Sequence, residues 1–181
     1  MNHDTLLKKL SYYGIGGVVF NWFKNFLSDR YQCTRIGFTF STFHVLLCGV
    51  PQGSILGPIL FSIYINDIHY ACNLSTPYLF ADDGALFFEN TCRNTYINMK
   101  IELMTIIKWL SANKLSFNGD KTEFMMFDQV DREDEIVVEF NESSFSITEC
   151  KVTKYLGLML DSKLNFKAHI DYIKKKVMKR K

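Results

Sequence analysis

Residues 78–88 read YLFADDGALFF, with two short apolar runs on either side of a pair of acids. An Asp-Gly pair between apolar runs is a strong signal for a β-hairpin. The sequence therefore predicts strands over residues 78–81 and 85–88, joined by a turn at residues 82–84. Asp is common at turns because its side chain bonds the nearby backbone, so a purely structural role is one interpretation of the pair. The other is divalent-metal binding, because carboxylate oxygens suit Mg²⁺.

A second punctuated stretch precedes this hairpin, where residues 49–58 read GVPQGSILGP. Its glycines and prolines predict a turn, followed by a helix over residues 59–70. Pro58 is well placed near that helix start, because the first turn of a helix does not need its missing N–H. A glycine in such a turn also lets the backbone approach a ligand closely. The alternative to a ligand-binding role for this stretch is a purely structural turn before the helix.

Apolar spacing and turn residues predict the remaining elements. Helices are expected over residues 4–10, 18–27 and 93–112 and from residue 169 onward, with Asp4 as the first N-cap and Asn113 as the stop of the third. Strands are expected as two hairpins, over 31–36 with 43–47 and over 136–140 with 145–148, and singly over 122–127 and 155–160. Residues 129–135 are acidic and predict a solvated turn. The alternation of strands and helices indicates an α+β domain.

The composition limits the classes of function that remain open. The 181 residues carry a net charge of only +2, so nucleic-acid contacts must come from local patches. The most apolar stretch, residues 45–65, contains too many prolines and glycines for a spanning helix. The first residues have no apolar core of a signal peptide, so a nuclear or cytoplasmic location is expected and secretion is not.

The cysteines form no recognisable metal or disulfide framework. They are Cys33, Cys48, Cys72, Cys92 and Cys150, an odd number without a C-x-x-C pair. Buried, reduced thiols are therefore expected.

Several motifs, taken in order, resemble those of reverse transcriptases. Residues 80–83, FADD, resemble the x-A-D-D signature of that family, and residues 49–58 look like its preceding block. Further matches are WLSANKLSFN at 109–118 with Lys121-Thr122, YLG at 155–157, and His169-Ile170 at the entry to the thumb. Residues 2–10, NHDTLLKKL, are similar to the segment after the first catalytic block in LINE-type elements, particularly the jockey-like branch. The chain thus resembles a truncated fragment of a non-LTR retrotransposon reverse transcriptase.

The resemblance implies a fold and an activity. The fold is a partial polymerase palm of the right-hand reverse transcriptase type. Residues 1–150 form a palm that lacks the fingers and the first catalytic block, and residues 151–181 form the primer-grip region and the start of the thumb. The activity is RNA-directed DNA polymerisation, a nucleotidyl transfer that uses two Mg²⁺ ions, with Mn²⁺ as a substitute. The partners are an RNA template, a DNA primer and deoxynucleoside triphosphates.

The same resemblance implies roles for individual residues. Asp82 and Asp83 would hold metal, and Lys121 would donate a proton to the leaving pyrophosphate, with Lys114 as a weaker candidate. The nucleotide- and template-binding positions would be Pro51, Gln52, Gly53, Ser54, Phe80 and Ala81. The primer would be supported by Tyr155, Leu156 and Gly157. The alternatives are an ordinary surface lysine at 121 and a strand with a glycine bend at 155–157.

Basic side chains are further candidates for contacts with nucleic-acid phosphates. They are Lys24, Arg30, Arg35 and the three lysines at 174–176. The alternative for the C-terminal lysines is a solvated helix end, where cations are favoured.

The family's first catalytic aspartate would precede Asn2, and it is not in this sequence. One aspartate cannot clamp two metal ions as a pair can, and a palm without that strand would have unpaired strand edges. We therefore expect the chain alone to be inactive and poorly stable. The competing interpretation is a catalytically inactive remnant that binds at most RNA or a protein partner.

Overall fold

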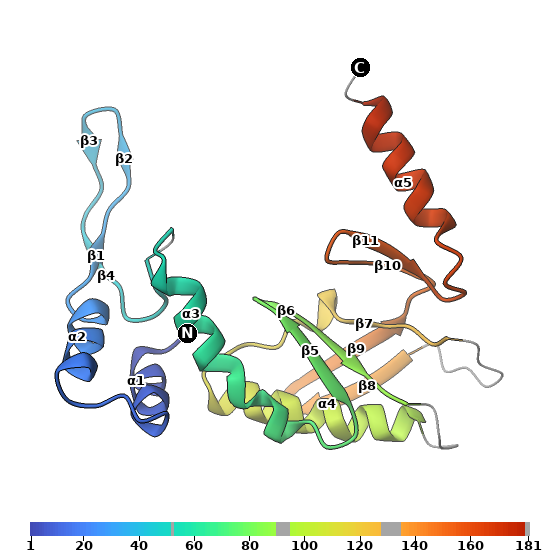
Figure 1. Ribbon diagram of the computed structural model, residues 1–181, viewed down its shortest axis with the longest axis horizontal. Helices are drawn as coiled ribbons and strands as arrows, with labels where there is room; N and C mark the ends of the chain where they lie inside the picture. The colour runs from blue at the N-terminus through green and yellow to red at the C-terminus, as the bar shows by residue number, and fades with distance from the viewer. Residues whose placement is uncertain (52, 90–94, 128–134, 180–181) are drawn as a thin grey trace. The chain divides into compact units, whose positions relative to one another are not determined.

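The computed structural model describes residues 1–51, 53–89, 95–127 and 135–179 (Figure 1). The helices are α1 (His3–Tyr12), α2 (Gly17–Leu27), α3 (Leu56–Ile65), α4 (Thr95–Ala112) and α5 (Lys167–Met178), with 3-10 turns η1 (Asn66–Ala71) and η2 (Gly119–Lys121). The strands are β1 (Tyr31–Gln32), β2 (Arg35–Ile36), β3 (Thr39–Phe40), β4 (His44–Val45), β5 (Thr76–Phe80), β6 (Asp83–Phe87), β7 (Glu123–Phe124), β8 (Glu135–Phe140), β9 (Ser143–Glu149), β10 (Val152–Tyr155) and β11 (Leu158–Asp161).

The described residues fall into two compact units. The first comprises Met1–Phe87 with Ile106–Ser116, and the second comprises Phe88–Thr105 with Phe117–Lys181. Each unit mixes helices with short sheets, which confirms the expected mixture of helix and strand. Within the part of the chain that the structure describes, no helix is both long and apolar enough to span a membrane.

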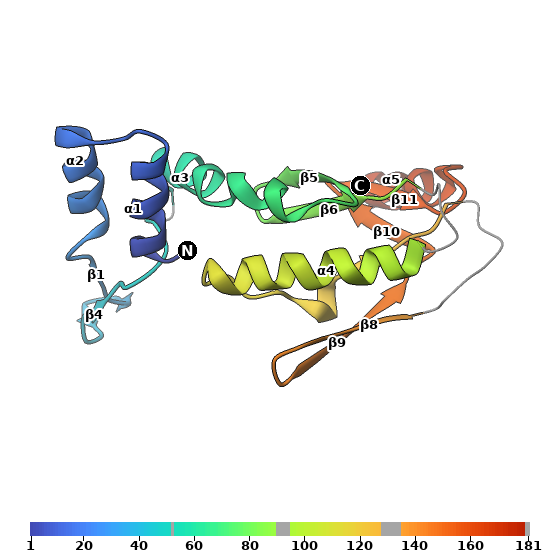
Figure 2. The same ribbon diagram turned by 90° about the horizontal axis from the view of Figure 1, so that it is seen from below.

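The core of the first unit lies where α1, α2 and α3 meet. Its fully buried side chains are Leu6, Leu10, Leu27, Leu60 and Tyr64. The helix pair α1 and α2 lies side by side in both views (Figure 2). The apolar stripe predicted for residues 18–27 is only partly buried, because Val18 and Trp22 remain exposed.

The start of α1 differs from the prediction in one respect. Asn2, not Asp4, is the N-cap, because its side-chain Oδ1 accepts the Thr5 N–H at 3.0 Å. Asp4 lies in the first turn, where its negative charge favours the positive end of the helix dipole. The cap therefore moves two positions toward the N-terminus, and α1 extends beyond the predicted end to Tyr12.

A buried hydroxyl and a half-buried ammonium join the helices of this unit. The Tyr64 hydroxyl donates to the Asn113 carbonyl and accepts the Asn2 N–H at 3.2 Å. Lys9 Nζ donates to the Tyr64 carbonyl at 2.6 Å and pairs with Asp67 Oδ1 at 2.5 Å. These contacts tie the start of α1, the end of α3 and the end of α4 together.

The hairpin predicted over residues 31–47 is present as two short ladders. Pairing of β1 with β4 forms the base, and pairing of β2 with β3 forms the tip. The ladders project as a long ribbon from the end of α2 (Figure 1). Most of its large apolar side chains are exposed, including Phe38 at the tip with 95% of its surface accessible.

The second unit contains a three-stranded sheet in the order β7-β9-β8. Side chains of β8 alternate between exposed and buried, with Ile136 and Val138 facing inward, so one face of the sheet is covered. Tyr96 of α4 meets Phe124 of β7 edge to face, with the ring centroids 5.9 Å apart. The predicted strand 122–127 shrinks to Glu123–Phe124, and Glu135 begins β8 rather than ending a turn. The rest of that predicted turn, residues 129–134, lies outside the described residues.

The strand predicted over residues 155–160 is wrong. A two-residue turn at Leu156 and Gly157 divides this stretch into β10 and β11, which pair antiparallel. Both turn residues have positive φ angles, 46° and 88°, which is the pattern of a type I′ hairpin turn. The Leu that precedes Gly157 concealed the turn, because Leu rarely adopts this conformation.

The described cysteines are reduced, and contrary to the expectation none of them is fully buried. Cys48 is exposed, Cys33, Cys72 and Cys150 are half-buried, and Cys92 lies outside the described residues. Burial and then the nearby Glu123 carboxylate raise the pKa of the Cys150 thiol to about 11. Both causes favour the neutral thiol over the thiolate.

We expect Tyr64→Phe to destabilise the fold by about 1–3 kcal/mol, because it leaves the Asn2 N–H and the Asn113 carbonyl without their shared partner. Urea unfolding measures the loss. The matched control is Tyr70→Phe, which removes a hydroxyl from a side chain that is 73% exposed. Equal effects of the two substitutions would contradict the structural role given to the Tyr64 hydroxyl.

We expect alkylation of Cys150 to reach half its maximal rate near pH 11, because burial and the nearby Glu123 carboxylate favour its neutral thiol. The folded-state pKa of Cys150 is raised, so its contribution to the free energy of unfolding is fully present below the unfolded pKa of about 8.5. That contribution is lost as the pH rises through about 11. Mass spectrometry of alkylated peptides against pH measures the Cys150 midpoint. Glu123→Gln should lower that midpoint, and an unchanged midpoint in this variant would argue against the assignment.

Candidate active site

The acidic pair lies at the end of the β5–β6 hairpin, but the turn is not where the sequence placed it. Phe80 pairs with Asp83, so Ala81 and Asp82 form a two-residue loop. Asp83 and Gly84 belong to β6 and not to the turn. The reason is the backbone of Ala81, whose φ of 52° supplies the left-handed residue that the tight loop requires.

Both carboxylates face solvent. Asp82 in the loop and Asp83 at the start of β6 are exposed, and within the described residues neither forms an ion pair. Phe80 and Ala81 beside them are exposed as well. Two adjacent carboxylates without a cation repel each other, so the hairpin tip is electrostatically suited to a divalent cation.

Within the described parts of the chain, no third His, Cys, Asp or Glu joins the pair to form a group of metal ligands. Among the described residues, no group of three or more His, Cys, Asp or Glu side chains could hold a metal ion. Mg²⁺ commonly binds through one or two protein carboxylates and keeps waters or substrate phosphates as its other ligands.

The stretch at residues 49–58 forms a turn that leads into α3. Gly53 has a φ of 80°, a conformation that side chains rarely adopt. Ser54 Oγ accepts the Gly57 N–H at 3.0 Å and so satisfies a free donor at the start of α3. Gly57 is buried against that hydroxyl, and a Cβ added there would lie 3.2 Å from it. Gln52 lies outside the described residues.

The helix after this turn begins earlier than predicted. Leu56 is its first residue and Pro58 its third, and the helix continues through η1 to Ala71. Pro58 is still within the first turn, where its missing N–H costs nothing. Pro51, Gly53, Ser54 and residues 80–83 all belong to the first compact unit.

Lys121, Tyr155, Leu156 and Gly157 belong to the second compact unit, and Lys114 belongs to the first. Lys121 ends η2 and is exposed, with its backbone N–H bonded to Asn118 Oδ1 at 3.3 Å. Tyr155, Leu156 and Gly157 form the β10–β11 turn, so the glycine bend is a complete reversal of the chain. Lys114 stands just after α4 with a φ of 55°, where the Leu115 N–H bonds back to the Leu110 carbonyl and closes the helix.

The family described as reverse transcriptase (RNA-dependent DNA polymerase) matches residues 1–160 of this chain. The chain belongs to this family. Among curated proteins it is 29% identical over 182 residues to the probable RNA-directed DNA polymerase from transposon BS of Drosophila melanogaster, which covers 93% of this chain and 19% of that protein. It is also 30% identical over 160 residues to the RNA-directed DNA polymerase from mobile element jockey of Drosophila funebris, covering 84% and 17%.

These relatives confirm the resemblance to jockey-like, non-LTR reverse transcriptases. A third relative, the probable RNA-directed DNA polymerase from transposon X-element of Drosophila melanogaster, is 27% identical over 163 residues, 86% of this chain and 17% of that protein. The chain spans about a fifth of the length of the curated relatives it matches. No solved structure gives a significant match.

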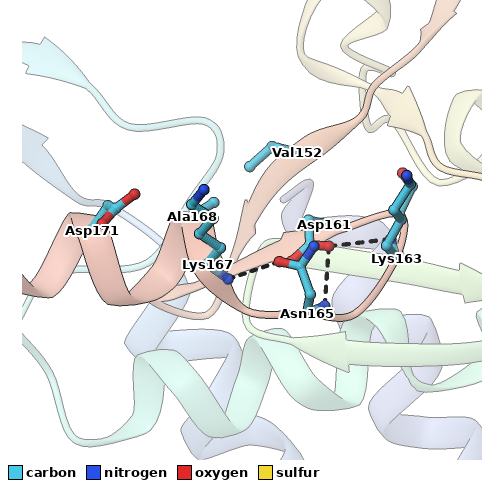
Figure 3. A pocket seen from close by; sticks show the side chains of 8 residues that line it. Val152, Asp161, Lys163, Asn165, Lys167, Ala168 and Asp171 are labelled. Carbon is cyan, nitrogen blue, oxygen red and sulfur yellow. Dashed lines mark hydrogen bonds between the residues drawn. The ribbon is translucent and has the colours of Figure 1, made fainter.

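Sequence reasoning missed one organising residue of this reverse transcriptase chain, Asp161. Its carboxylate is buried and accepts the backbone N–H groups of Lys163 at 3.2 Å and Asn165 at 3.1 Å (Figure 3). It also accepts the Phe166 N–H at 2.8 Å. These bonds shape the loop between β11 and α5. An Asp before Ser-Lys-Leu-Asn was the available signal, because Asp side chains commonly bond the backbone that follows them.

A second contact links α5 to the same hairpin. The Met159 N–H donates to His169 Nδ1 at 3.3 Å, so the histidine in the predicted thumb entry satisfies a strand amide of β11. His169 also stacks on Tyr172, and Lys154 lies over the Tyr172 ring with its Nζ 5.5 Å from the centroid. Together with the Asp161 loop, these contacts hold the β10–β11 hairpin and the start of α5 as one piece.

We expect Ala81→Gly to stabilise the β5–β6 hairpin by about 1 kcal/mol, because it removes the Cβ from a left-handed position. Ala81→Val should weaken the hairpin by a similar amount. Hydrogen exchange of the amides paired between β5 and β6 measures both effects. At Ala85, an ordinary strand position, substitution by Gly should weaken the hairpin and substitution by Val should stabilise it. Faster exchange in Ala81→Gly would contradict the loop assignment.

Proposed function

We propose that this chain carries part of the nucleotidyl-transfer site of a transposon-encoded RNA-directed DNA polymerase. The observation that carries the proposal is the exposed Asp82-Asp83 pair at a tight hairpin tip, in a chain whose residues 1–160 match the reverse transcriptase family. The curated relatives are named RNA-directed DNA polymerases, which supports the same activity. The substrates would be an RNA template, a DNA primer and deoxynucleoside triphosphates.

Asp82 and Asp83 would hold the metal, which we propose to be Mg²⁺, with Mn²⁺ as a substitute. Their carboxylates are hard oxygen ligands, and their exposure leaves room for substrate phosphates to complete the coordination. When bound, the metal stabilises the negative charge that develops during phosphoryl transfer. The rigid two-residue loop fixes the backbone of both acids relative to the strands, so little reordering is needed on binding.

Pro51, Gln52, Gly53 and Ser54, with Phe80 and Ala81, would contact the incoming nucleotide and the template base. The left-handed Gly53 supports this role, because a position without a side chain lets a ligand approach the backbone. The role of Ser54 is partly structural, since its hydroxyl already accepts the Gly57 N–H. Phe80 offers an exposed ring on which a base or sugar can pack.

Lys121 would donate a proton from Nζ to the leaving pyrophosphate, and the turn at Tyr155, Leu156 and Gly157 would support the primer. The exposure of Lys121 leaves its ammonium available for that contact. The Asp161 loop and His169 support the second role, because they make the hairpin that carries the turn a rigid element. Rigid elements position ligands more accurately than mobile loops.

We further propose the right-hand architecture for the whole protein. Residues 1–150 would be palm, and residues 151–181 would be the primer-grip region and the beginning of the thumb. The expected location is nuclear or cytoplasmic. The three lysines at 174–176 in α5 would add contacts with nucleic-acid phosphates that do not depend on sequence.

Primer extension tests the function directly. The assay uses an RNA template, a DNA primer, Mg²⁺ and the longest reading frame that contains residues 1–181. Asp82→Asn should lower kcat about a hundredfold or more, because it removes a group that positions charge stabilisation in the transition state. Asp120→Asn, which neutralises an exposed aspartate in η2, is the matched control and should leave kcat unchanged.

A second measurement separates metal binding from catalysis. Mn²⁺ bound to the 181-residue chain is counted by electron paramagnetic resonance, and Asp82→Asn and Asp83→Asn should each weaken binding while Asp120→Asn does not. Primer extension by the Asp82→Asn variant at the wild-type rate would refute the proposed site. Absence of extension by the wild-type protein would favour the alternative of an inactive remnant.

A further inference from the structure

A pocket of about 320 Å³ lies beside the turn that precedes α3. Its wall combines His3 of α1, residues at the end of α2, Gln32 of β1 and the stretch 46–51. All of these residues belong to the first compact unit. Of the residues given roles above, Pro51 and the candidate phosphate contact Arg30 belong to this wall.

Arg30 is the cation of this pocket, and two contacts with Phe26 hold its guanidinium in place. Nε donates to the Phe26 carbonyl at 2.9 Å, and the guanidinium carbon lies 4.9 Å from the centre of the Phe26 ring. Within the described residues, the two terminal nitrogens have no hydrogen-bond partner. A fork of donors is therefore oriented in advance and left for a ligand.

Two polar side chains accompany the arginine. His3 Nε2 lies 2.7 Å from the Gly49 carbonyl, and because a carbonyl only accepts, that nitrogen carries a proton. The bond fixes the imidazole ring in the wall of the pocket. Gln32 adds an amide that can donate or accept.

The chemistry of the wall favours an anion of low charge that carries apolar surface. Arg30 is the only Lys or Arg among the described residues that line the pocket, and none of them is Asp or Glu. A triphosphate would bring several negative charges to one cation. Leu46, Val50 and Pro51 present apolar atoms, which fit a sugar ring better than a free ion. A phosphodiester within a strand has one charge, acceptor oxygens for the arginine fork, and a sugar on each side.

We propose that this pocket binds one phosphodiester of a nucleic-acid strand, with Arg30 as its principal ligand. The proposal rests on the proposed polymerase function, and it assigns to a built pocket one contact with the strand that the enzyme uses. The turn at Gly49 and Pro51 forms one wall, so the bound strand passes next to the stretch that enters α3. Arg30 thereby positions the strand without touching the reacting atoms.

Arg35 provides a matched comparison, since it is held in the same manner outside the pocket. Its Nε donates to the Gly37 carbonyl at 2.8 Å, and its guanidinium carbon lies 5.3 Å from the centre of the Phe40 ring. It lies in β2 near the tip of the exposed ribbon. Arg30→Met and Arg35→Met therefore remove the same charge and similar local contacts from two different places.

The test measures binding of the 181-residue chain to a fluorescein-labelled single-stranded RNA by anisotropy over a series of salt concentrations. Arg30→Met should weaken binding about tenfold and lower the slope of log affinity against log salt by about 0.7, the value for one phosphate of a single strand. Arg35→Met should weaken binding by less than about threefold, as an exposed charge does. Equal losses in both variants would overturn the proposal in favour of a general charge effect.

Two further variants guard against a folding defect. Arg30→Lys keeps the charge but not the fork, so it should restore the salt slope and only part of the affinity. Cys48→Trp introduces a large ring at the wall and leaves both contacts of Arg30 intact, so it should weaken RNA binding as well. Wild-type affinity in Cys48→Trp would overturn the pocket as the site. Thermal unfolding of each variant checks that the fold is kept.

Competition distinguishes the strand from a free nucleotide. Unlabelled RNA and unlabelled single-stranded DNA should both displace the probe, whereas a deoxynucleoside triphosphate at the same phosphate concentration should not. Displacement by the triphosphate that is lost in Arg30→Met would overturn the assignment to a strand. Unchanged RNA binding in Arg30→Met would refute the pocket and leave the polymerase function standing, whereas no RNA binding by the wild-type chain would count against both.

Discussion

The Tyr64 hydroxyl is the interaction on which the first compact unit depends. It is buried in the core, where a polar group must find partners, and it binds the Asn2 N–H and the Asn113 carbonyl at once. These partners are far apart in the chain, so the hydroxyl fixes the start of α1 against the ends of α3 and α4. Because α3 begins within residues 49–58, the hydrogen bonds of the Tyr64 hydroxyl also help to hold the turn that we place beside the nucleotide.

Local backbone geometry then places the two acids. The pairing of Phe80 with Asp83 leaves a loop of two residues, and the left-handed Ala81 makes that loop feasible. The carboxylates consequently lie exposed at the tip of the hairpin. The second unit uses a comparable device, because a buried Asp161 organises the loop that joins the β10–β11 hairpin to α5. Tight turns therefore carry both the proposed metal ligands and the proposed primer support.

Sequence reasoning succeeded where a signal is local and failed where a neighbour decides. Apolar spacing predicted α2 and the β8–β9 hairpin, and the acidic pair predicted the β5–β6 hairpin. The exact turn was misplaced because Asp-Gly is a better turn former than Ala-Asp, yet the register of the strands chose the latter. Asp4 was expected to cap α1, but the pairing of Asn2 with Cys48 sets the chain so that Asn2 takes that position.

The sequence by itself determined the family and the order of the elements, because ordered motifs and periodicity are properties of the chain alone. It also identified Asp82 and Asp83 as the candidate metal ligands. Only the tertiary structure decided the register of the hairpins, the split of residues 155–160 and the pocket around Arg30. The physical reason is that the pocket depends on contacts between distant residues, such as His3 with Gly49. The two hairpin turns depend on left-handed backbones at Ala81 and Leu156, a conformation that these residue types rarely adopt.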